Sequence, residues 1–266
     1  MLDAPIDLDK PPRSAFTLLG IRKASVFTGL CSHHDNTLFA PIEKEAFDPN
    51  NREQLRLHAY RAVLQETHAS IESAARLQSS YLKACNLGMS DPNNPGPGAM
   101  SVNHRLVATY ETWLYKEECD RAMSTPPGFD FEHDVLFFTG TGPRIAVSAL
   151  FSLDNLIVGD DIARAAITVF PTEAGDTYAI FSYLPRDAAM VRAELTQLLA
   201  SRGATQKYFL SRLIIERCQN VAFAPAVVDA MAPLQRSTIS EFYNATTLYN
   251  DSKFQSPLLN LFEESA

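Results

Sequence analysis

Cysteine and long apolar runs are both scarce in this sequence. Its four cysteines lie far apart and include no C-x-x-C pair, which excludes a disulfide framework of closely spaced cysteines. No window approaches the roughly 18 consecutive apolar residues that a membrane-spanning helix needs. The N-terminus has no cationic stretch followed by an apolar one, the pattern of a secretory signal. These absences predict a cytoplasmic protein with reduced thiols and no membrane association.

Positive charge is also in short supply. Lys and Arg number 23 against 31 Asp and Glu, a net charge of −8. Broad, sequence-independent binding to nucleic acid or to anionic membranes needs clustered cations and is not expected. The P-loop, Gly-x-Ser-x-Gly, His-Glu-x-x-His and EF-hand motifs are missing as well. With 266 residues, 46% of them hydrophobic, the chain is long enough to bury a substantial core.

Helical periodicity governs the first half of the chain. A helix is predicted from Arg52 to Cys85, after the start signal Asp48-Pro-Asn-Asn51, and an antiparallel one follows over 102–123. Apolar residues and one histidine recur along the first helix at three- and four-residue spacing. This predicted buried stripe comprises Leu57, Tyr60, Leu64, His68, Ile71, Ala75 and Leu82.

Strand-like runs rich in β-branched and aromatic residues follow. Strands are predicted over 135–138, 145–151, 163–170 and 178–183, with hairpin turns at Gly140–Pro143 and Thr172–Asp176. Helices are then expected over 185–201, 205–219 and 234–249. The chain is expected to begin with a loose arm (1–14) and to end in a mobile tail (251–266). Strands that cluster in sequence predict an α+β fold. Its expected parts are an arm and knuckle (1–47), a helical pair (48–124) and a sheet with C-terminal helices (125–266), packed as one globular unit.

The segment Cys31-Ser-His-His-Asp35 is the most chemically suggestive part of the chain. A thiol at Cys31 and an imidazole at His34, after a turn at Gly29, have a spacing that lets both reach one metal ion. The simpler interpretation is a core thiol and a polar loop histidine. His33 and Asp35 would flank the metal, or Asp35 would cap the turn through its neighbours Asn36 and Thr37. His68 is either a buried histidine bonded to a backbone carbonyl or a ligand facing this knuckle.

Residues Gly20–Glu43 resemble a family of uncharacterised bacterial proteins with a C-x-x-H-D-x-x-L-F-x-P-I-E signature. The resemblance implies a treble-clef metal knuckle of the HNH endonuclease kind, in which Cys31 and His34 are the second ligand pair for zinc. In that family a C-x-x-C pair and a Ser-His element come first, and the histidine that activates water in HNH nucleases lies in that half. This chain has neither, so we expect a degenerate or N-terminally truncated member.

Three functions follow from these observations. The first is a nucleic-acid-related protein with an HNH-like zinc knuckle, acting in bacterial genome or phage conflict. The alternative is a non-enzymatic protein-binding or structural module, working with a protein partner or as a homo-oligomer. The third is a hydrolase in which His34-Asp35 is the doublet of an HD-type metal site, a site that also needs a histidine upstream.

Overall fold

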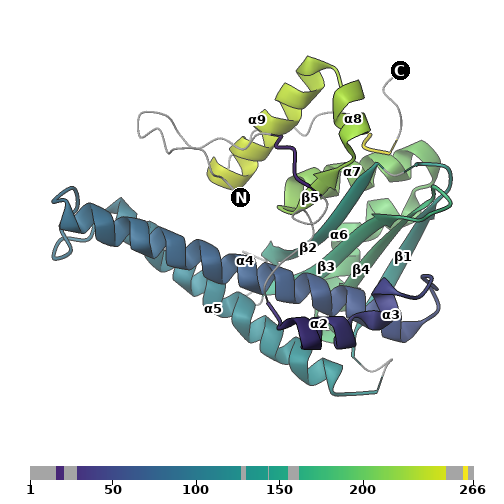
Figure 1. Cartoon of the computed structure of the whole chain (residues 1–266), viewed down its shortest axis with the longest axis horizontal. Helices are drawn as coiled ribbons and strands as arrows, with labels where there is room; N and C mark the ends of the chain where they lie inside the picture. Colours follow the sequence, from purple (N-terminus) through teal and green to yellow (C-terminus); the bar gives the residue numbers. More distant parts are fainter. Residues whose placement is uncertain are drawn as a thin grey trace.

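An antiparallel sheet lies between two layers of helices in the computed structural model, which confirms the expected α+β class (Figure 1). The structure describes residues 16–20, 29–126, 130–142, 144–154, 162–249 and 260–262. The predicted arm at 1–14 lies outside these ranges. Within them, no helix is both long enough and apolar enough to cross a membrane.

The sheet has the strand order β1-β4-β3-β2-β5. Its strands are β1 (Glu132–Phe138), β2 (Ile145–Asp154), β3 (Ile162–Pro171), β4 (Thr177–Tyr183) and the short β5 (Val221–Phe223). The four longer strands match the predicted runs, whereas β5 was not predicted. The turn at 172–176 joins the paired strands β3 and β4, as expected.

The hairpin predicted at Gly140–Pro143 is wrong, because β1 pairs with β4 and not with β2. The connection instead crosses the end of the β3–β4 hairpin, where the Gly142 amide donates to the Gly175 carbonyl at 2.8 Å. The Gly140 amide donates to Asp176 Oδ1 at 2.9 Å. Gly140 and Gly142 both have positive φ, which glycine adopts without steric cost, and this makes the crossing possible.

Alternate residues of β3 face the two helical layers. Ala163, Ala165 and Ile167 join the core beneath α6 (Ala188–Ala200) and α7 (Gly203–Arg217). Ala166 faces the opposite layer, formed by the long helices α4 (Arg52–Asn86) and α5 (Pro97–Met123). The sheet is therefore apolar on both faces, and its central strands are almost fully buried.

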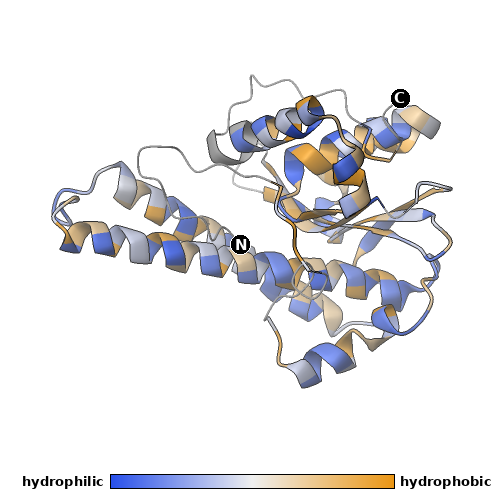
Figure 2. Cartoon of the chain, turned by 45° about the horizontal axis from the view of Figure 1, so that its top comes forward, coloured by the Kyte–Doolittle hydropathy of each residue, from blue (hydrophilic) through white to orange (hydrophobic). Residues whose placement is uncertain are grey.

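The hairpin of α4 and α5 extends well beyond the sheet (Figure 1). Buried side chains on α4 continue only as far as Ala74, while Ile71 is 48% and Leu82 54% exposed. The prediction of one buried stripe to Leu82 is therefore wrong, because the second half of the helix has no sheet to cover. Figure 2 shows apolar and polar residues mixed along this arm to its tip.

Two short helices, α2 (Ser32–Leu38) and α3 (Ala40–Glu43), precede α4 and pack against it. Pro41 lies in the first turn of α3, where a proline costs no backbone hydrogen bond.

Two residues of the C-terminal segment pack on the sheet. After α8 (Pro225–Ala230) and α9 (Pro233–Tyr249), Leu261 and Phe262 are each 2% exposed. Phe262 stacks on Phe138 with ring centroids 5.6 Å apart, and Arg144 Nε donates to the Leu261 carbonyl at 3.1 Å. The prediction of a mobile tail is wrong for these two residues, because apolar burial holds them on the sheet.

Candidate metal centre

Cys31 and His34 come together at the start of α2. Cys31 is the N-cap, in an extended conformation, and His34 lies in the first helical turn. Residues three apart share one face of a helix, so both side chains project to the same side. The Cys31 Sγ and His34 Nδ1 atoms are 3.3 Å apart, and both residues are exposed. The spacing predicted from the sequence is thus realised as a convergent pair of donors.

The separation of these two donors suits a tetrahedral metal site. Zinc with a thiolate at about 2.3 Å and an imidazole nitrogen at about 2.0 Å separates the two ligand atoms by about 3.5 Å. The observed 3.3 Å is close to this value, so an ion could bind both atoms with little rearrangement of the helix start. A hydrogen bond between thiol and imidazole occupies the same geometry when no ion is bound.

Among the described residues, the other predicted candidates do not complete a ligand set with this pair. The His33 ring centroid lies 5.7 Å from that of His34, and the His33 carbonyl accepts a hydrogen bond from Thr37. Asp35 is half-buried in the first turn, but Cys31 and not Asp35 is the N-cap, so its predicted capping role is wrong. His68 is half-buried on α4, one turn after Leu64. Across the described ranges, no three His, Cys, Asp or Glu side chains converge as a ligand group.

Helix α4 fixes the position of the knuckle through an apolar cluster. Phe39 between α2 and α3 is fully buried against Leu57 and Leu64 of α4. Arg61 of α4 packs over the Phe39 ring, 5.2 Å from its centroid, and pairs with Glu43 at 2.8 Å. The helix start that holds Cys31 and His34 is therefore anchored on a rigid element.

Gln54 adds a polar anchor that the sequence analysis missed. Its side-chain amide donates to the carbonyls of Pro41 and Ala46, each at 3.0 Å. Its Oε1 atom accepts from the Asp48 amide at 2.8 Å. Gln54 is only 1% exposed, so these bonds satisfy a buried side chain and fix the loop between α3 and α4. Only the folded structure brings these partners together.

A serine–histidine pair on β1 and β4 was also missed. Ser182 Oγ lies 2.8 Å from His133 Nδ1, and the two residues are directly opposite each other in the sheet. Burial lowers the pKa of His133 to about 4, so its imidazole is neutral at pH 7. Ser182 is 2% exposed. It lies opposite Ala166 in the β3–β4 register, on the sheet face that packs against α4. The hydroxyl is therefore not accessible to a substrate.

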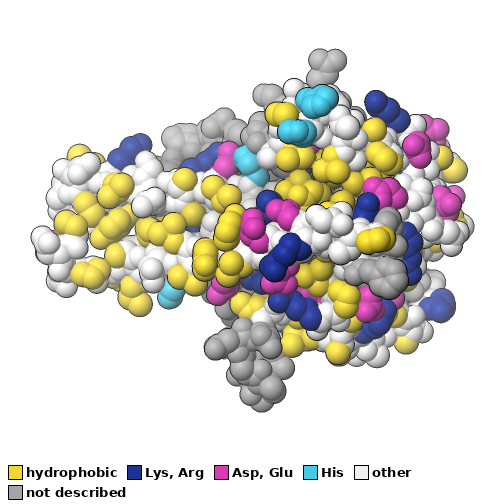
Figure 3. All heavy atoms as spheres, turned by 90° about the horizontal axis from the view of Figure 1, so that it is seen from below, with side chains coloured by type: hydrophobic (Ala, Val, Ile, Leu, Met, Phe, Trp, Pro, Cys, Tyr) yellow, Lys and Arg dark blue, Asp and Glu magenta, His cyan; other side chains and the backbone are white. Residues whose placement is uncertain are grey.

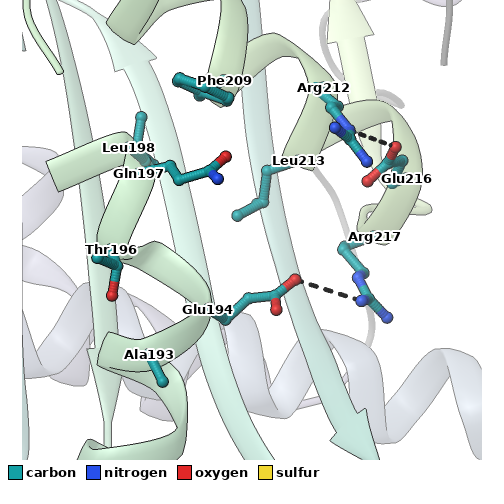
Figure 4. Close-up of a pocket in the computed structure, with 10 residues that line it drawn as sticks. All are labelled: Ala193, Glu194, Thr196, Gln197, Leu198, Phe209, Arg212, Leu213, Glu216 and Arg217. Atoms are coloured by element: carbon teal, nitrogen blue, oxygen red, sulfur yellow. Dashed lines mark hydrogen bonds and ion pairs between the residues drawn. The ribbon is translucent and has the colours of Figure 1, made fainter. Parts of the chain in front are cut away.

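A groove of about 510 Å³ lies between α6 and α7 (Figure 4). Its charged side chains are already paired with one another. Arg212 contacts Glu216 at 2.7 Å, and Arg217 contacts Glu194 at 3.3 Å. Because these charged side chains already pair with one another, we assign no function to the groove.

No protein-family model, curated protein or solved structure matches this chain. The resemblance to an HNH-like knuckle at residues 20–43 therefore remains a prediction. The geometry of Cys31 and His34 is the strongest structural argument for chemistry in the described part of the chain.

Proposed function

We propose that this protein binds a zinc-class cation through Cys31 and His34, as a degenerate or N-terminally truncated HNH-like knuckle with a nucleic-acid-related role. The observation that carries the proposal is the 3.3 Å separation of the Sγ and Nδ1 atoms at a helix start anchored on α4. The sequence resemblance supports the same two residues as a ligand pair. A role in genome or phage conflict rests on that resemblance alone.

The donor set defines which ion fits. A thiolate and a neutral imidazole favour Zn²⁺ over Mg²⁺ or Ca²⁺, which prefer oxygen ligands. The ion, when bound, supplies a Lewis-acidic centre at the start of α2. Cys31 must release its thiol proton to bind, so affinity should fall as the pH falls. Two donors leave two positions of a tetrahedral ion for water or for ligands beyond the described residues.

Titration with Co²⁺, a spectroscopic substitute for Zn²⁺, tests the proposal. The wild-type protein should bind one equivalent with a near-ultraviolet thiolate-to-cobalt band. Cys31→Ala should abolish that band, and His34→Ala should weaken binding at least tenfold. His33→Ala, the adjacent histidine, and Cys85→Ala, a thiol elsewhere in the chain, are the matched controls and should bind as wild type. Absence of the band, or equal loss in the controls, overturns the proposal.

Plasmid cleavage tests the nuclease component of the resemblance separately. Cutting that depends on Mg²⁺ or Mn²⁺ and disappears in Cys31→Ala and His34→Ala would support an active HNH-like enzyme. Metal binding without cutting would support a degenerate knuckle. Cutting that both variants retain would show that the activity does not come from this site.

A further inference from the structure

Exposed apolar side chains are concentrated on the projecting part of the α4–α5 hairpin, residues 69–114, which we call the hairpin arm. Among the described residues, ten of the fourteen exposed large apolar side chains lie between positions 71 and 114. Figure 3 shows apolar side chains spread over this arm. The ten residues are Ile71, Leu82, Leu87, Met89, Met100, Leu106, Val107, Tyr110, Trp113 and Leu114.

The arm has almost no core of its own. Of residues 75–114, all of which the structure describes, only Val102 is buried. Helices draw most of their stability from packing an apolar face, and isolated helices are marginal in water. An arm of two helices that leaves its apolar residues exposed therefore gains stability when another surface covers them.

One face of α5 has a pattern that is the same in both directions. Leu106, Val107, Tyr110, Trp113 and Leu114, which we call the α5 stripe, are each 40–59% exposed. Counted from Tyr110, they occupy positions −4, −3, 0, +3 and +4, which fall on one helix face. Tyr110 and Trp113 stack with ring centroids 6.0 Å apart. A second copy running antiparallel would present apolar side chains at the same spacing, with Val107 and Trp113 exchanging places.

From this symmetry we propose that two copies of the chain pair through the α5 stripe, with their α5 helices antiparallel and Tyr110 at the two-fold axis. Leu106 of one copy then meets the partner's Leu114, and Val107 meets the partner's Trp113. A two-fold interface needs a self-complementary patch, and a stripe whose apolar positions are evenly spaced about Tyr110 meets that requirement. The two hairpins together form a four-helix arrangement.

The charge of the arm favours this partner. Residues 69–114 contain three acids (Glu72, Asp91, Glu111) and three bases (Arg76, Lys83, Arg105), so the arm is neutral in a chain of net charge −8. Two copies meeting here avoid the repulsion that other faces of an acidic protein would bring. The arm also lacks the cation cluster that an anionic membrane or a nucleic acid would require.

The apolar area is of the right order for a dimer. The five stripe residues expose roughly 400–500 Å² per copy, given that whole aromatic side chains bury about 150–250 Å². A stable interface takes about 800 Å² from each partner. The stripe therefore supplies roughly half of the area that a stable interface takes.

Solution mass and the fluorescence of Trp113, the only tryptophan, test the pairing together. The wild-type chain should have twice the 29.4 kDa monomer mass, and dilution should shift Trp113 emission to longer wavelength as the interface opens. Tyr110→Glu should raise the dimer dissociation constant at least 100-fold, because two like charges meet at the axis. Leu234→Glu, at a leucine that is 77% exposed on α9, is the matched control and should remain dimeric.

Disulfide trapping tests the register, in a chain whose Cys31 and Cys85 are replaced by serine. Tyr110→Cys should crosslink to itself. Leu106→Cys alone should not, because its two copies lie about 12 Å apart along the helices, beyond disulfide reach. Leu106→Cys mixed with Leu114→Cys should crosslink.

Three results would overturn the proposal. The wild-type chain could be monomeric at 100 µM, or it could form a dimer that Tyr110→Glu leaves intact. It could also be a monomer that binds zwitterionic vesicles through the stripe. None of these outcomes involves the metal-binding pair, so failure here is distinguishable from failure of the proposed function.

Discussion

At the scale of single residues, Gln54 links the stability of α4 to the position of the knuckle. Three hydrogen bonds join its buried side chain to the loop between α3 and α4. A neutral hydrogen bond contributes about 1 kcal/mol, and a buried group that loses its partner costs about 1–3 kcal/mol. The position of Cys31 and His34 thus depends on a residue some twenty positions later in the sequence.

We expect Gln54→Ala to lower the free energy of unfolding by about 2–3 kcal/mol and to weaken Co²⁺ binding several-fold, because α2 and α3 lose their polar anchor. Gln78→Ala, on the exposed part of the same helix, should change neither quantity. Urea unfolding and cobalt titration of the two variants supply the comparison. An unaltered metal affinity in a destabilised Gln54→Ala protein would refute the link to the knuckle.

How well a residue's contacts could be predicted depended on how far along the sequence its partners lie from it. The closeness of Cys31 and His34 was predictable, because they lie only three positions apart in the sequence. Their role as metal ligands stays a prediction. Gln54 bonds to residues 6, 8 and 13 positions away, two in an irregular loop and one in α3. The His133–Ser182 pair needs the β1–β4 register. No local pattern reports such contacts, so both were missed.

At the scale of elements, the start of α4 is defined by its cap. The Asn51 side chain accepts hydrogen bonds from the amides of Glu53 and Gln54, at 3.0 and 3.2 Å. These amides have no partner within the helix, and N-cap substitutions to alanine cost about 1 kcal/mol. Asn51→Ala should therefore lower the free energy of unfolding by about 1 kcal/mol in urea melts. Asn94→Ala, in the exposed loop between α4 and α5, should have no measurable effect, and an equal loss there would contradict the capping argument.

Elements were predicted better than their arrangement. Helix and strand positions follow from local periodicity, and the predicted α4 and the four longer strands agree with the structure. The pairing of β1 with β4 was not predicted, because a short turn with two glycines also fits a hairpin. The burial of the second half of α4 was overestimated, because periodicity cannot show where the covering sheet ends. Strand β5, at three residues, is too short to give a pattern.

At the scale of the whole molecule, two buried histidines make stability depend on pH. Burial lowers the pKa of His58 and of His133 to about 4, against about 6.5 for a free histidine. Between these values the unfolded chain binds protons that the folded chain does not, so stability falls as the pH falls. Burial raises the pKa of Glu66 and Asp187, which acts in the opposite direction. A single-site variant is therefore needed to measure what one histidine contributes to the pH dependence of stability.

His58→Phe should reduce the loss of stability between pH 7.5 and pH 5 by about 2 kcal/mol relative to wild type. The ring of His58 stacks on Phe170 with centroids 5.0 Å apart and an interplanar angle of 12°, a contact that phenylalanine can keep. Unfolding free energies of both proteins at the two pH values give the difference. If the variant is as acid-sensitive as wild type, His58 takes up its proton in the folded protein between pH 7.5 and pH 5, which contradicts the prediction.

The central proposal is that Cys31 and His34, at the start of α2, bind a zinc-class cation. X-ray absorption of the zinc-loaded full chain reads the ligand shell directly. We expect one sulfur at about 2.3 Å together with nitrogen or oxygen neighbours at about 2.0–2.1 Å, and loss of the sulfur shell in Cys31→Ala. A shell of nitrogen and oxygen alone in the wild-type protein, or a sulfur shell that Cys31→Ala leaves in place, would contradict the assignment of Cys31 and His34 as ligands.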